Sequence, residues 1–181
     1  MSDTGRKLVV LDRDGVINED SDDYVKSPDE WRALPGSLDA IARLHAAGFD
    51  VVVATNQSGV GRGLYSMDTV DAIHARLRAE AGAAGGAIAG IYVCPHRPED
   101  GCDCRKPRPG LLRKIEEDFR CSLRGVPFVG DKLTDVEAAR AVGARPLFVG
   151  GRSEADRRAA EALGVPIYPD LAAAVDALLA E

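Results

Sequence analysis

The sequence lacks a long apolar run and an excess of positive charge. No segment approaches the roughly 18 apolar residues of a membrane span, and residues 1–6 hold no apolar stretch of signal-peptide length. We therefore expect a soluble, cytoplasmic protein with no membrane partner. Lys and Arg number 23 against 29 Asp and Glu, a net charge of -6. This balance argues against a nucleic-acid partner, since such binding relies on cations that neutralise phosphates, but it permits a small phosphorylated substrate.

Internal repeats, low-complexity tracts, linkers and coiled-coil patterns are also missing. The 181 residues suit one domain with its own core, so we expect a single domain over residues 1–181 and a monomer. Only four cysteines are present, and three of them lie with a histidine within eleven residues. In a reducing compartment this grouping indicates a metal site rather than disulfides. Cys121 stands apart, and we expect it to be inert and at least half-buried.

Apolar runs and helical periodicity alternate along the chain. Short β-branched runs predict buried strands, whereas apolar residues at helical spacing predict amphipathic helices. Strands are expected at residues 7–11, 50–54, 87–93, 126–129, 147–149 and 166–168. Helices are expected at residues 37–47, 66–81, 109–120, 134–142, 154–163 and 170–179. The alternation predicts an α/β fold, a doubly wound parallel sheet with helices on both faces.

Polar clusters follow three of these strands and precede one helix. They are Asp12-Arg13-Asp14-Gly15, Thr55-Asn56-Gln57-Ser58-Gly59, Gly130-Asp131-Lys132-Leu133-Thr134-Asp135 and, before the helix, Arg105-Lys106-Pro107. Ligands bind beyond the carboxyl ends of parallel strands, so the four clusters can meet at one edge of the sheet. Each cluster alone is more often a solvated turn or a helix cap. Their combination in this order is far more specific than any one of them.

The residue types in these clusters suit phosphoryl transfer. Asp12 and Asp14 point to the same side of an extended segment, and two close carboxylates repel unless a cation or a shared proton relieves them. Oxygen-rich acidic sites suit Mg²⁺, and Asp131 offers a further carboxylate. Thr55 can donate to phosphate oxygens, and the Lys106 ammonium can offset the charge of a transferring phosphoryl group. The sequence therefore predicts a magnesium-dependent phosphoryl-transfer site.

The order of the motifs resembles the haloacid dehalogenase (HAD) superfamily of aspartate-nucleophile phosphatases. Asp-x-Asp-Gly-Val, Thr-Asn-Gln-Ser, Arg-Lys-Pro and Gly-Asp-x-x-x-Asp follow one another as in that superfamily. The likeness runs from about residue 7 to about residue 150, and the last thirty or so residues carry no motif. Within the superfamily, the longer strings at 11–18, 55–59, 94–96, 102–107 and 130–132 resemble the heptose-bisphosphate phosphatases.

The resemblance implies a role for each matching residue. Asp12 would be the nucleophile that forms an aspartyl-phosphate. Asp14 would be general acid and then general base, because a sugar alkoxide must be protonated as it leaves. Mg²⁺ would bind the Asp12 carboxylate, the Asp14 backbone carbonyl and the Asp131 carboxylate, while Thr55 and Lys106 would hold the phosphoryl oxygens. Substrate contacts are implied for Asp20, Ser21, Asp22, Asp23, Asn56, Gln57, Ser58, Arg105 and Lys132.

The cysteine-rich loop at residues 94–104 has the pattern C-x-H-x₅-C-x-C, formed by Cys94, His96, Cys102 and Cys104. Three thiolates and one imidazole suit a closed tetrahedral Zn²⁺ site, so the role should be structural. The resemblance supports this prediction, because these phosphatases carry such a zinc loop. The alternatives are a Cys102–Cys104 redox pair and free thiols. Cys104 directly precedes the two cations of the Arg-Lys-Pro motif, so the loop would hold them at the active site.

The spacing of the motifs leaves no room for a separate cap domain. About forty residues separate Asp14 from Thr55, and about fifty separate Ser58 from Lys106. A helix and one or two strands fill each interval. The site should therefore be open, with loops supplying specificity.

Two questions of function stay open at this point. The substrate implied by the resemblance is D-glycero-D-manno-heptose 1,7-bisphosphate, dephosphorylated at C7 on the route to nucleotide-activated heptose for lipopolysaccharide core. Histidinol phosphate is the alternative substrate, since phosphatases of that compound have a similar domain and zinc loop. A phosphoaccepting or binding module without turnover is the alternative of another class.

Overall fold

The computed structural model describes residues 7–181; residues 1–6, where we expect no signal peptide, lie outside the described residues. Six parallel strands form one sheet in the order β3-β2-β1-β4-β5-β6. The strands are β1 (Lys7–Leu11), β2 (Phe49–Asn56), β3 (Gly90–Cys94), β4 (Pro127–Gly130), β5 (Arg145–Val149) and β6 (Ile167–Tyr168). The sheet confirms the expected fold class.

Seven helices connect the strands in the described part of the chain. They are α1 (Ser37–Ala46), α2 (Ser58–Gly61), α3 (Met67–Ala83), α4 (Gly110–Phe119), α5 (Leu133–Ala141), α6 (Glu154–Ala162) and α7 (Leu171–Leu179). Two short 3₁₀ turns, Pro28–Glu30 and Pro98–Asp100, lie in the loops after β1 and β3. In residues 7–181 none of the helices is long and apolar enough to cross a membrane.

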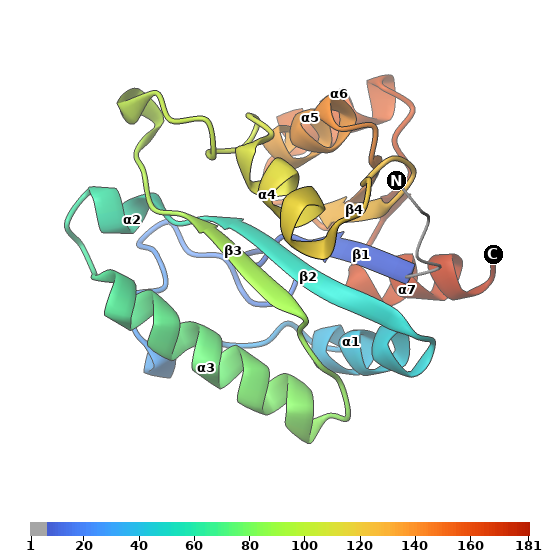
Figure 1. The fold of residues 1–181 in the computed structure, drawn as a ribbon, viewed down its shortest axis with the longest axis horizontal. Coiled ribbons are helices and arrows are strands. Elements are labelled where there is room, and N and C mark those ends of the chain that lie inside the picture. Colours follow the sequence, from blue (N-terminus) through green and yellow to red (C-terminus); the bar gives the residue numbers. More distant parts are fainter. Residues whose placement is uncertain (1–6) are drawn as a thin grey trace.

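The helices form two layers, one on each face of the sheet (Figure 1). Val9 and Leu11 of β1 belong to the core beneath α1, α3 and α7. Leu8 and Val10 belong to the core beneath α4 and α5, and α6 packs beside α5 on that face. Because successive side chains of a strand point to opposite faces, an unbroken apolar run is what a strand buried on both sides requires.

Several boundaries differ from the sequence prediction. The third strand begins at Gly90, three residues later than expected, and continues to Cys94. Ala89 still donates its N–H to the Val51 carbonyl at 2.7 Å, but this bond lies outside the ladder. The four-residue helix α2 was not predicted, because Ser-Gly-Val-Gly carries no apolar periodicity. Ser66 caps α3 as expected, its Oγ accepting from Thr69 N at 3.2 Å.

The strand order reverses direction at β1, which has β2 on one side and β4 on the other. The chain leaves β1 toward β2 and β3 and later crosses back to β4, so the loops after β1 and β4 diverge there. The first residue after β1, Asp12, donates its backbone N–H to Val129 O of β4 at 2.9 Å. Such a switch point is where open α/β sheets bind ligands.

Candidate active site

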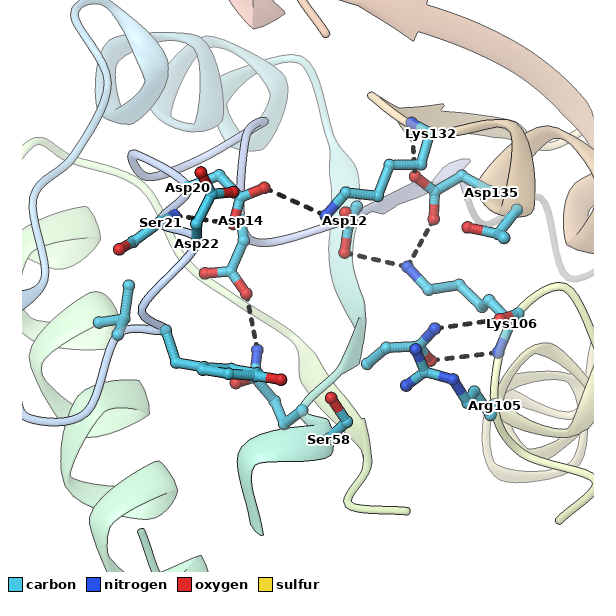
Figure 2. A pocket seen from close by; sticks show the side chains of 15 residues that line it. Asp12, Asp14, Asp20, Ser21, Asp22, Ser58, Arg105, Lys106, Lys132 and Asp135 are labelled. Atoms are coloured by element: carbon cyan, nitrogen blue, oxygen red, sulfur yellow. Dashed lines mark hydrogen bonds and ion pairs between the residues drawn. The ribbon is translucent and has the colours of Figure 1, made fainter. Parts of the chain in front are cut away.

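Lys106 lies between two buried carboxylates at the carboxyl end of the sheet (Figure 2). Its Nζ donates to Asp12 Oδ1 at 2.9 Å, to Asp135 Oδ1 at 2.6 Å and to the Ala54 carbonyl at 2.8 Å. All three charged side chains are almost fully buried. Burial by itself disfavours the ammonium, but attraction to Asp12 and Asp135 outweighs burial and raises the pKa of Lys106. The lysine is therefore held charged beside Asp12.

Three carboxylates approach closely enough to share a cation, namely those of Asp12, Asp131 and Asp135, which we call the carboxylate cluster. Asp135 is already engaged, because its Oδ1 accepts from Lys106 and its Oδ2 accepts from Asp131 N and Lys132 N, both at 3.2 Å. Asp131 differs, since its Oδ1 is buried and has no hydrogen-bond partner among residues 7–181. Burial and the nearby charge of Asp12 raise the pKa of Asp131 to about 9.

A divalent cation fits this arrangement. A buried carboxylate oxygen without a donor is costly, and a cation beside Asp131 and Asp12 would satisfy that oxygen and favour its ionised form. Gly15 makes room for the same group. A Cβ at Gly15 would lie 2.1 Å from Asp131 Oδ2, and the residue has a φ of +83°. Asp12 and Asp131 are therefore the better candidates for side-chain ligands, because Asp135 is already the partner of Lys106.

Asp14 is surrounded by hydrogen-bond donors. Its Oδ1 accepts from Arg13 Nε at 3.1 Å, Arg13 Nη2 at 2.8 Å and Asn18 Nδ2 at 2.9 Å, and its Oδ2 accepts from Gln57 Nε2 at 2.8 Å. Burial opposes ionisation, but the charge of Arg13 and the hydrogen bonds outweigh it and lower the pKa of Asp14. In this state Asp14 is a carboxylate, the form that can accept a proton.

A cavity of about 410 Å³ opens above these groups. It is lined by most of the predicted site residues, namely Asp12, Asp14, Asp20, Ser21, Asp22, Asn56, Gln57, Ser58, Arg105, Lys106 and Lys132. Tyr24, Val25, Thr134 and Asp135 also line it, although they were not predicted. Three predicted residues do not line it. Asp131 lines two adjoining cavities, Asp23 is exposed, and Thr55 is fully buried with its Oγ1 accepting from Gln57 at 2.8 Å.

Two of the lining residues already have protein partners. The Asn56 amide pairs with the backbone of Lys106, donating to its carbonyl and accepting from its N–H, both at 3.1 Å. Asn56 thus holds the lysine in place from the neighbouring strand end. Lys132 donates to Asp20 Oδ2 at 3.2 Å, which joins the loop after β1 to the start of α5. Both residues reach the cavity while fixing its walls.

The four predicted metal ligands of the loop after β3 lie together, and we call them the cysteine cluster. Cys94 Sγ lies 3.6 Å from His96 Nδ1 and 3.7 Å from Cys102 Sγ, while Cys104 Sγ lies 3.3 Å from His96 Nδ1 and 3.6 Å from Cys102 Sγ. Ligands about 2.1–2.3 Å from a tetrahedral Zn²⁺ lie roughly 3.5–3.8 Å from one another, so these spacings suit a single such ion. A disulfide needs about 2.05 Å between sulfurs. The spacing therefore argues against an oxidised Cys102–Cys104 pair.

The cysteine cluster is joined to the active site through the backbone. Gln57 donates its N–H to the Cys94 carbonyl at 2.7 Å, and Gly61 donates to the Pro95 carbonyl at 2.9 Å. Arg105 Nη1 lies 3.4 Å from the His96 carbonyl. The ligands thus adjoin both the Thr-Asn-Gln-Ser motif and the Arg-Lys-Pro motif.

The residues between His96 and Cys102, of which all but Arg97 are exposed, bond to one another. Arg97 donates its N–H to Asp100 Oδ2 at 2.8 Å and its Nη2 to Asp100 Oδ1 at 2.9 Å. Gly101 then turns the chain back with a φ of +65°. Neither of these Arg97–Asp100 hydrogen bonds joins the turn to a residue that lines the active-site cavity.

Comparisons with known proteins agree with this geometry. A family model described as HAD-hydrolase-like matches residues 103–174. The D-glycero-beta-D-manno-heptose-1,7-bisphosphate 7-phosphatase of Pseudomonas aeruginosa is 51% identical over 180 residues, covering 96% of this chain and 98% of that protein. This chain belongs to the heptose-bisphosphate phosphatase family. The enzyme of the same name from Pseudomonas putida is 54% identical over 171 residues, covering 92% of this chain and 96% of that protein.

A solved structure of the family agrees as well. The crystal structure of D,D-heptose 1,7-bisphosphate phosphatase from B. bronchiseptica, complexed with magnesium and phosphate, has a TM-score of 0.89 and 49% identity. The match covers 96% of this chain and 98% of that one. Magnesium and phosphate in that relative are the two ligands that the carboxylate cluster and Lys106 suit here.

Part of this active site was not predicted from the sequence. Asp135 had no role, although an acid at the third position of a helix that follows Gly-Asp signals a capping contact. Gly130 allows that contact, because a Cβ there would lie 2.3 Å from Asp135 Cβ. Arg13 and Asn18 were also missed as partners of Asp14, and only the fold of the loop after β1 brings Asn18 back to that carboxylate.

Proposed function

We propose that this chain is a magnesium-dependent phosphatase that removes the 7-phosphate of D-glycero-D-manno-heptose 1,7-bisphosphate and leaves the 1-phosphate. The observation that carries the proposal is the charged Lys106 bonded to Asp12, with the unpartnered Asp131 oxygen beside them. The relatives at 51% and 54% identity bear the name of this activity with the β anomer, which we adopt. The reaction belongs to the supply of nucleotide-activated heptose for lipopolysaccharide core.

The first chemical step is attack by Asp12. A carboxylate oxygen forms a bond to phosphorus as the bond between phosphorus and the C7 oxygen breaks, giving an aspartyl-phosphate. Lys106 holds Asp12 through Oδ1 and keeps a positive charge next to the phosphoryl oxygens. Thr55 is the second group that we assign to those oxygens. Asp135 keeps Lys106 oriented from the far side.

Asp14 carries the proton in both steps. The departing sugar oxygen takes a proton from Asp14, and Asp14 later removes one from the water that hydrolyses the aspartyl-phosphate. The carboxylate form, which the charge of Arg13 and the hydrogen bonds favour, suits the second step. For the first step Asp14 must gain a proton, and a phosphate dianion bound nearby promotes this because like charge raises the pKa of a carboxyl group.

Two metal ions complete the proposal. Asp12, Asp131 and the backbone carbonyl of Asp14 would hold Mg²⁺, which would neutralise charge on the phosphoryl group when bound. Cys94, His96, Cys102 and Cys104 would hold a structural Zn²⁺ with no position left for catalysis. The sites differ in donor type in the way that the two ions require.

The remaining substrate contacts come from loops. We assign them to Asp20, Ser21, Asp22, Asp23, Asn56, Gln57, Ser58, Arg105 and Lys132, which surround or adjoin the cavity. Residues 1–181 form one phosphatase domain in this proposal, with the zinc loop at 94–104. We further propose a monomer that acts in the cytoplasm on a small sugar phosphate, without nucleic acid or membrane as partner.

The experiment that tests the function is a phosphate-release assay with two substrates. Heptose 1,7-bisphosphate and histidinol phosphate are compared at equal concentrations, each with Mg²⁺ and with EDTA. We expect preference for the heptose bisphosphate, dependence on Mg²⁺, and release of one phosphate per molecule. Preference for histidinol phosphate would overturn the substrate. Hydrolysis of neither compound with metal present would overturn the enzyme and favour a phosphoaccepting or binding module.

A further inference from the structure

His74 is a buried polar residue on the apolar face of α3. It shares the buried face of that helix with Val70, Ile73, Leu77 and Ala81, and is only 6% exposed. Within residues 7–181 the imidazole has one hydrogen-bond partner, Arg13, whose Nη1 lies 3.1 Å from His74 Nε2. A histidine so placed meets a specific donor within the core.

The chemistry of this pair sets the state of the imidazole. A guanidinium only donates hydrogen bonds, so His74 Nε2 must accept and the ring proton must sit on Nδ1. Burial, followed by the charge of Arg13, lowers the pKa of His74 to about 3. The imidazole is therefore neutral at working pH and available as an acceptor. It does not line the active-site cavity.

Arg13 connects this acceptor to Asp14. The arginine is fully buried, its Nη1 faces His74, and its Nε and Nη2 both donate to Asp14 Oδ1. Each nitrogen of the guanidinium is thus satisfied by one of two side chains. The plane of the guanidinium, and with it the position of Asp14 Oδ1, depends on the acceptor behind it.

The other oxygen of Asp14 is held in a similar way. Gln57 Nε2 donates to Asp14 Oδ2 at 2.8 Å, and Gln57 Oε1 accepts from the Tyr65 hydroxyl at 2.9 Å. Tyr65 can reach Gln57 because Gly59 has no side chain. A Cβ at Gly59 would lie 2.2 Å from the Tyr65 ring. Tyr65 thereby settles which end of the Gln57 amide faces Asp14.

We infer that His74 and Tyr65 are positioning residues for proton transfer by Asp14, His74 acting through Arg13 and Tyr65 acting through Gln57. The inference rests on the proposed function, in which Asp14 protonates the leaving sugar oxygen. Neither residue lines the active-site cavity. Proton transfer needs the two heavy atoms at hydrogen-bond distance, and a displacement of about 1 Å can cost as much as a hundredfold in rate. Loss of Tyr65 would loosen the hold on Asp14 Oδ2, and loss of His74 would loosen the hold of Arg13 on Oδ1 and leave Asn18 as the other donor to that oxygen.

The leaving group distinguishes this role from simple support of the fold. A sugar oxygen leaves as a poor alkoxide and needs the proton, whereas p-nitrophenolate leaves readily without it. Phosphorylation of Asp12 is otherwise the same reaction for both. A defect confined to the position of Asp14 should therefore slow release of the sugar and spare release of p-nitrophenol.

The test measures leaving-group release in the first turnover, before hydrolysis of the aspartyl-phosphate contributes. The variants are His74→Leu, His74→Gln and Tyr65→Phe, with Tyr92→Phe as a matched control whose hydroxyl bonds the exposed Asp118. Substrates are heptose 1,7-bisphosphate, histidinol phosphate and p-nitrophenyl phosphate, all with Mg²⁺. Thermal unfolding of each variant checks that it is folded at the assay temperature.

We expect His74→Leu and Tyr65→Phe to release the alkyl leaving group about tenfold or more slowly, with p-nitrophenol release changed less than about twofold. His74→Gln should recover most of the loss, because its amide oxygen can accept from Arg13. Equal slowing of both leaving groups, or no slowing in folded variants, overturns the inference. If His74→Leu fails to fold, Tyr65→Phe decides alone. A wild type that cleaves neither alkyl phosphate refutes the proposed function itself, whereas an active wild type with unselective variants refutes only the positioning role.

Discussion

The carboxylate cluster and the cysteine cluster are two groups of side chains that could each hold a metal ion, and they are built in opposite ways. The carboxylate cluster collects Asp12 from the end of β1, Asp131 from the end of β4 and Asp135 from the first turn of α5, and Asp12 is far from the other two in the sequence. The cysteine cluster comes from eleven consecutive residues, Cys94–Cys104. The first exists only once the sheet has formed. The second needs only a loop and the end of one strand.

The difference in chemistry follows from this difference in construction. In the carboxylate cluster, one oxygen each of Asp12 and Asp135 accepts from Lys106, whereas one buried oxygen of Asp131 has no partner among residues 7–181. Such an arrangement leaves positions for water and phosphate around a hard cation. In the cysteine cluster all four donors lie within one another's reach at nearly equal distances. Around one metal ion that arrangement would leave no open position, as a structural site requires, whereas the carboxylate cluster would leave open positions, as a catalytic site requires.

Asp12→Asn should have the largest effect, because it changes the carboxylate cluster and leaves the cysteine cluster intact. An amide is not a nucleophile toward phosphate, so turnover should fall by about 10⁴-fold or more. Zinc content should stay unchanged, because the cysteine cluster does not include this residue. Phosphate release and atomic emission measure the two effects, and Asp71→Asn on the exposed side of α3 is the control. Retained turnover would refute the nucleophile.

Asp135→Asn tests the support of Lys106 inside the carboxylate cluster. The variant removes one of the two negative charges bonded to Lys106 Nζ but keeps an oxygen that can accept. We expect kcat to fall by about 10- to 100-fold, with a smaller change in KM. Asp156→Asn is the matched control, since Asp156 also accepts a backbone N–H at the start of a helix, from Leu133 at 3.3 Å. Equal effects of the two substitutions would remove Asp135 from the catalytic machinery.

Cys104→Ser tests whether the structural site serves the working one. The ligand directly precedes Arg105 and Lys106, so loss of the ion should loosen both cations. Zinc content should drop and the phosphatase rate should fall by about tenfold. Cys121→Ser, outside the cluster, should keep both. Zinc loss with an unchanged rate would show that the loop does not hold the active site in place.

Gly15→Ala tests the close approach of Gly15 to Asp131 of the carboxylate cluster through the free energy of unfolding. Gly15 and Gly48 share a φ of +83°, but a Cβ at Gly15 would lie 2.1 Å from Asp131 Oδ2, whereas a Cβ at Gly48 meets nothing within 4 Å. Gly48→Ala should cost about 1 kcal/mol from the backbone conformation, and Gly15→Ala about 1–2 kcal/mol more. Urea unfolding measures both. A magnesium titration should show weaker activation for Gly15→Ala alone, and equal costs would contradict the close approach.

The smallest expected effect concerns pH and the core beside the carboxylate cluster. His74 has a pKa lowered to about 3 by burial and then by Arg13, so the unfolded chain binds its proton first as pH falls below about 6.5. Stability is therefore lost as pH drops. Between pH 7.5 and 5.5 the free energy of unfolding of the wild type should fall by about 1 kcal/mol more than that of His74→Gln. Parallel pH profiles would mean that His74 takes up its proton at the same pH in the folded and the unfolded chain, which would contradict the lowered pKa.

Much of the site could be predicted because its residues follow strands. An apolar run that ends in acids predicts a buried strand, and it predicts that the acids after the strand lie at the carboxyl edge of the sheet. This reasoning is why Asp12 and Asp131 were expected to lie close together. Lys106 was placed by the same reasoning from the start of a helix. The cysteine cluster was predictable from its residue types and spacing together with the family resemblance, since all four residues are local in the sequence.

The rest of the site depends on contacts between elements, which no local pattern reveals. His74 looks like an interruption in the apolar face of α3 until that helix packs beside the turn that carries Arg13. Asp135 reads as an ordinary acid of a first helical turn, and its bond to Lys106 appears only when α5 and the segment before α4 adjoin. Boundaries such as the start of β3 also differed, because small apolar residues before Gly90 satisfy the strand pattern without joining the ladder.

The turn Arg97–Gly101 has a use beyond this enzyme's chemistry. Its ends are fixed by metal-ligand positions on both sides, and its own residues are largely exposed and bonded to each other. Exposed turns tolerate inserted peptides. We therefore expect that a fluorescent or affinity tag inserted after Glu99 would leave turnover intact and would report on the ion beside it. The molecule thus offers a built-in attachment point for a sensor.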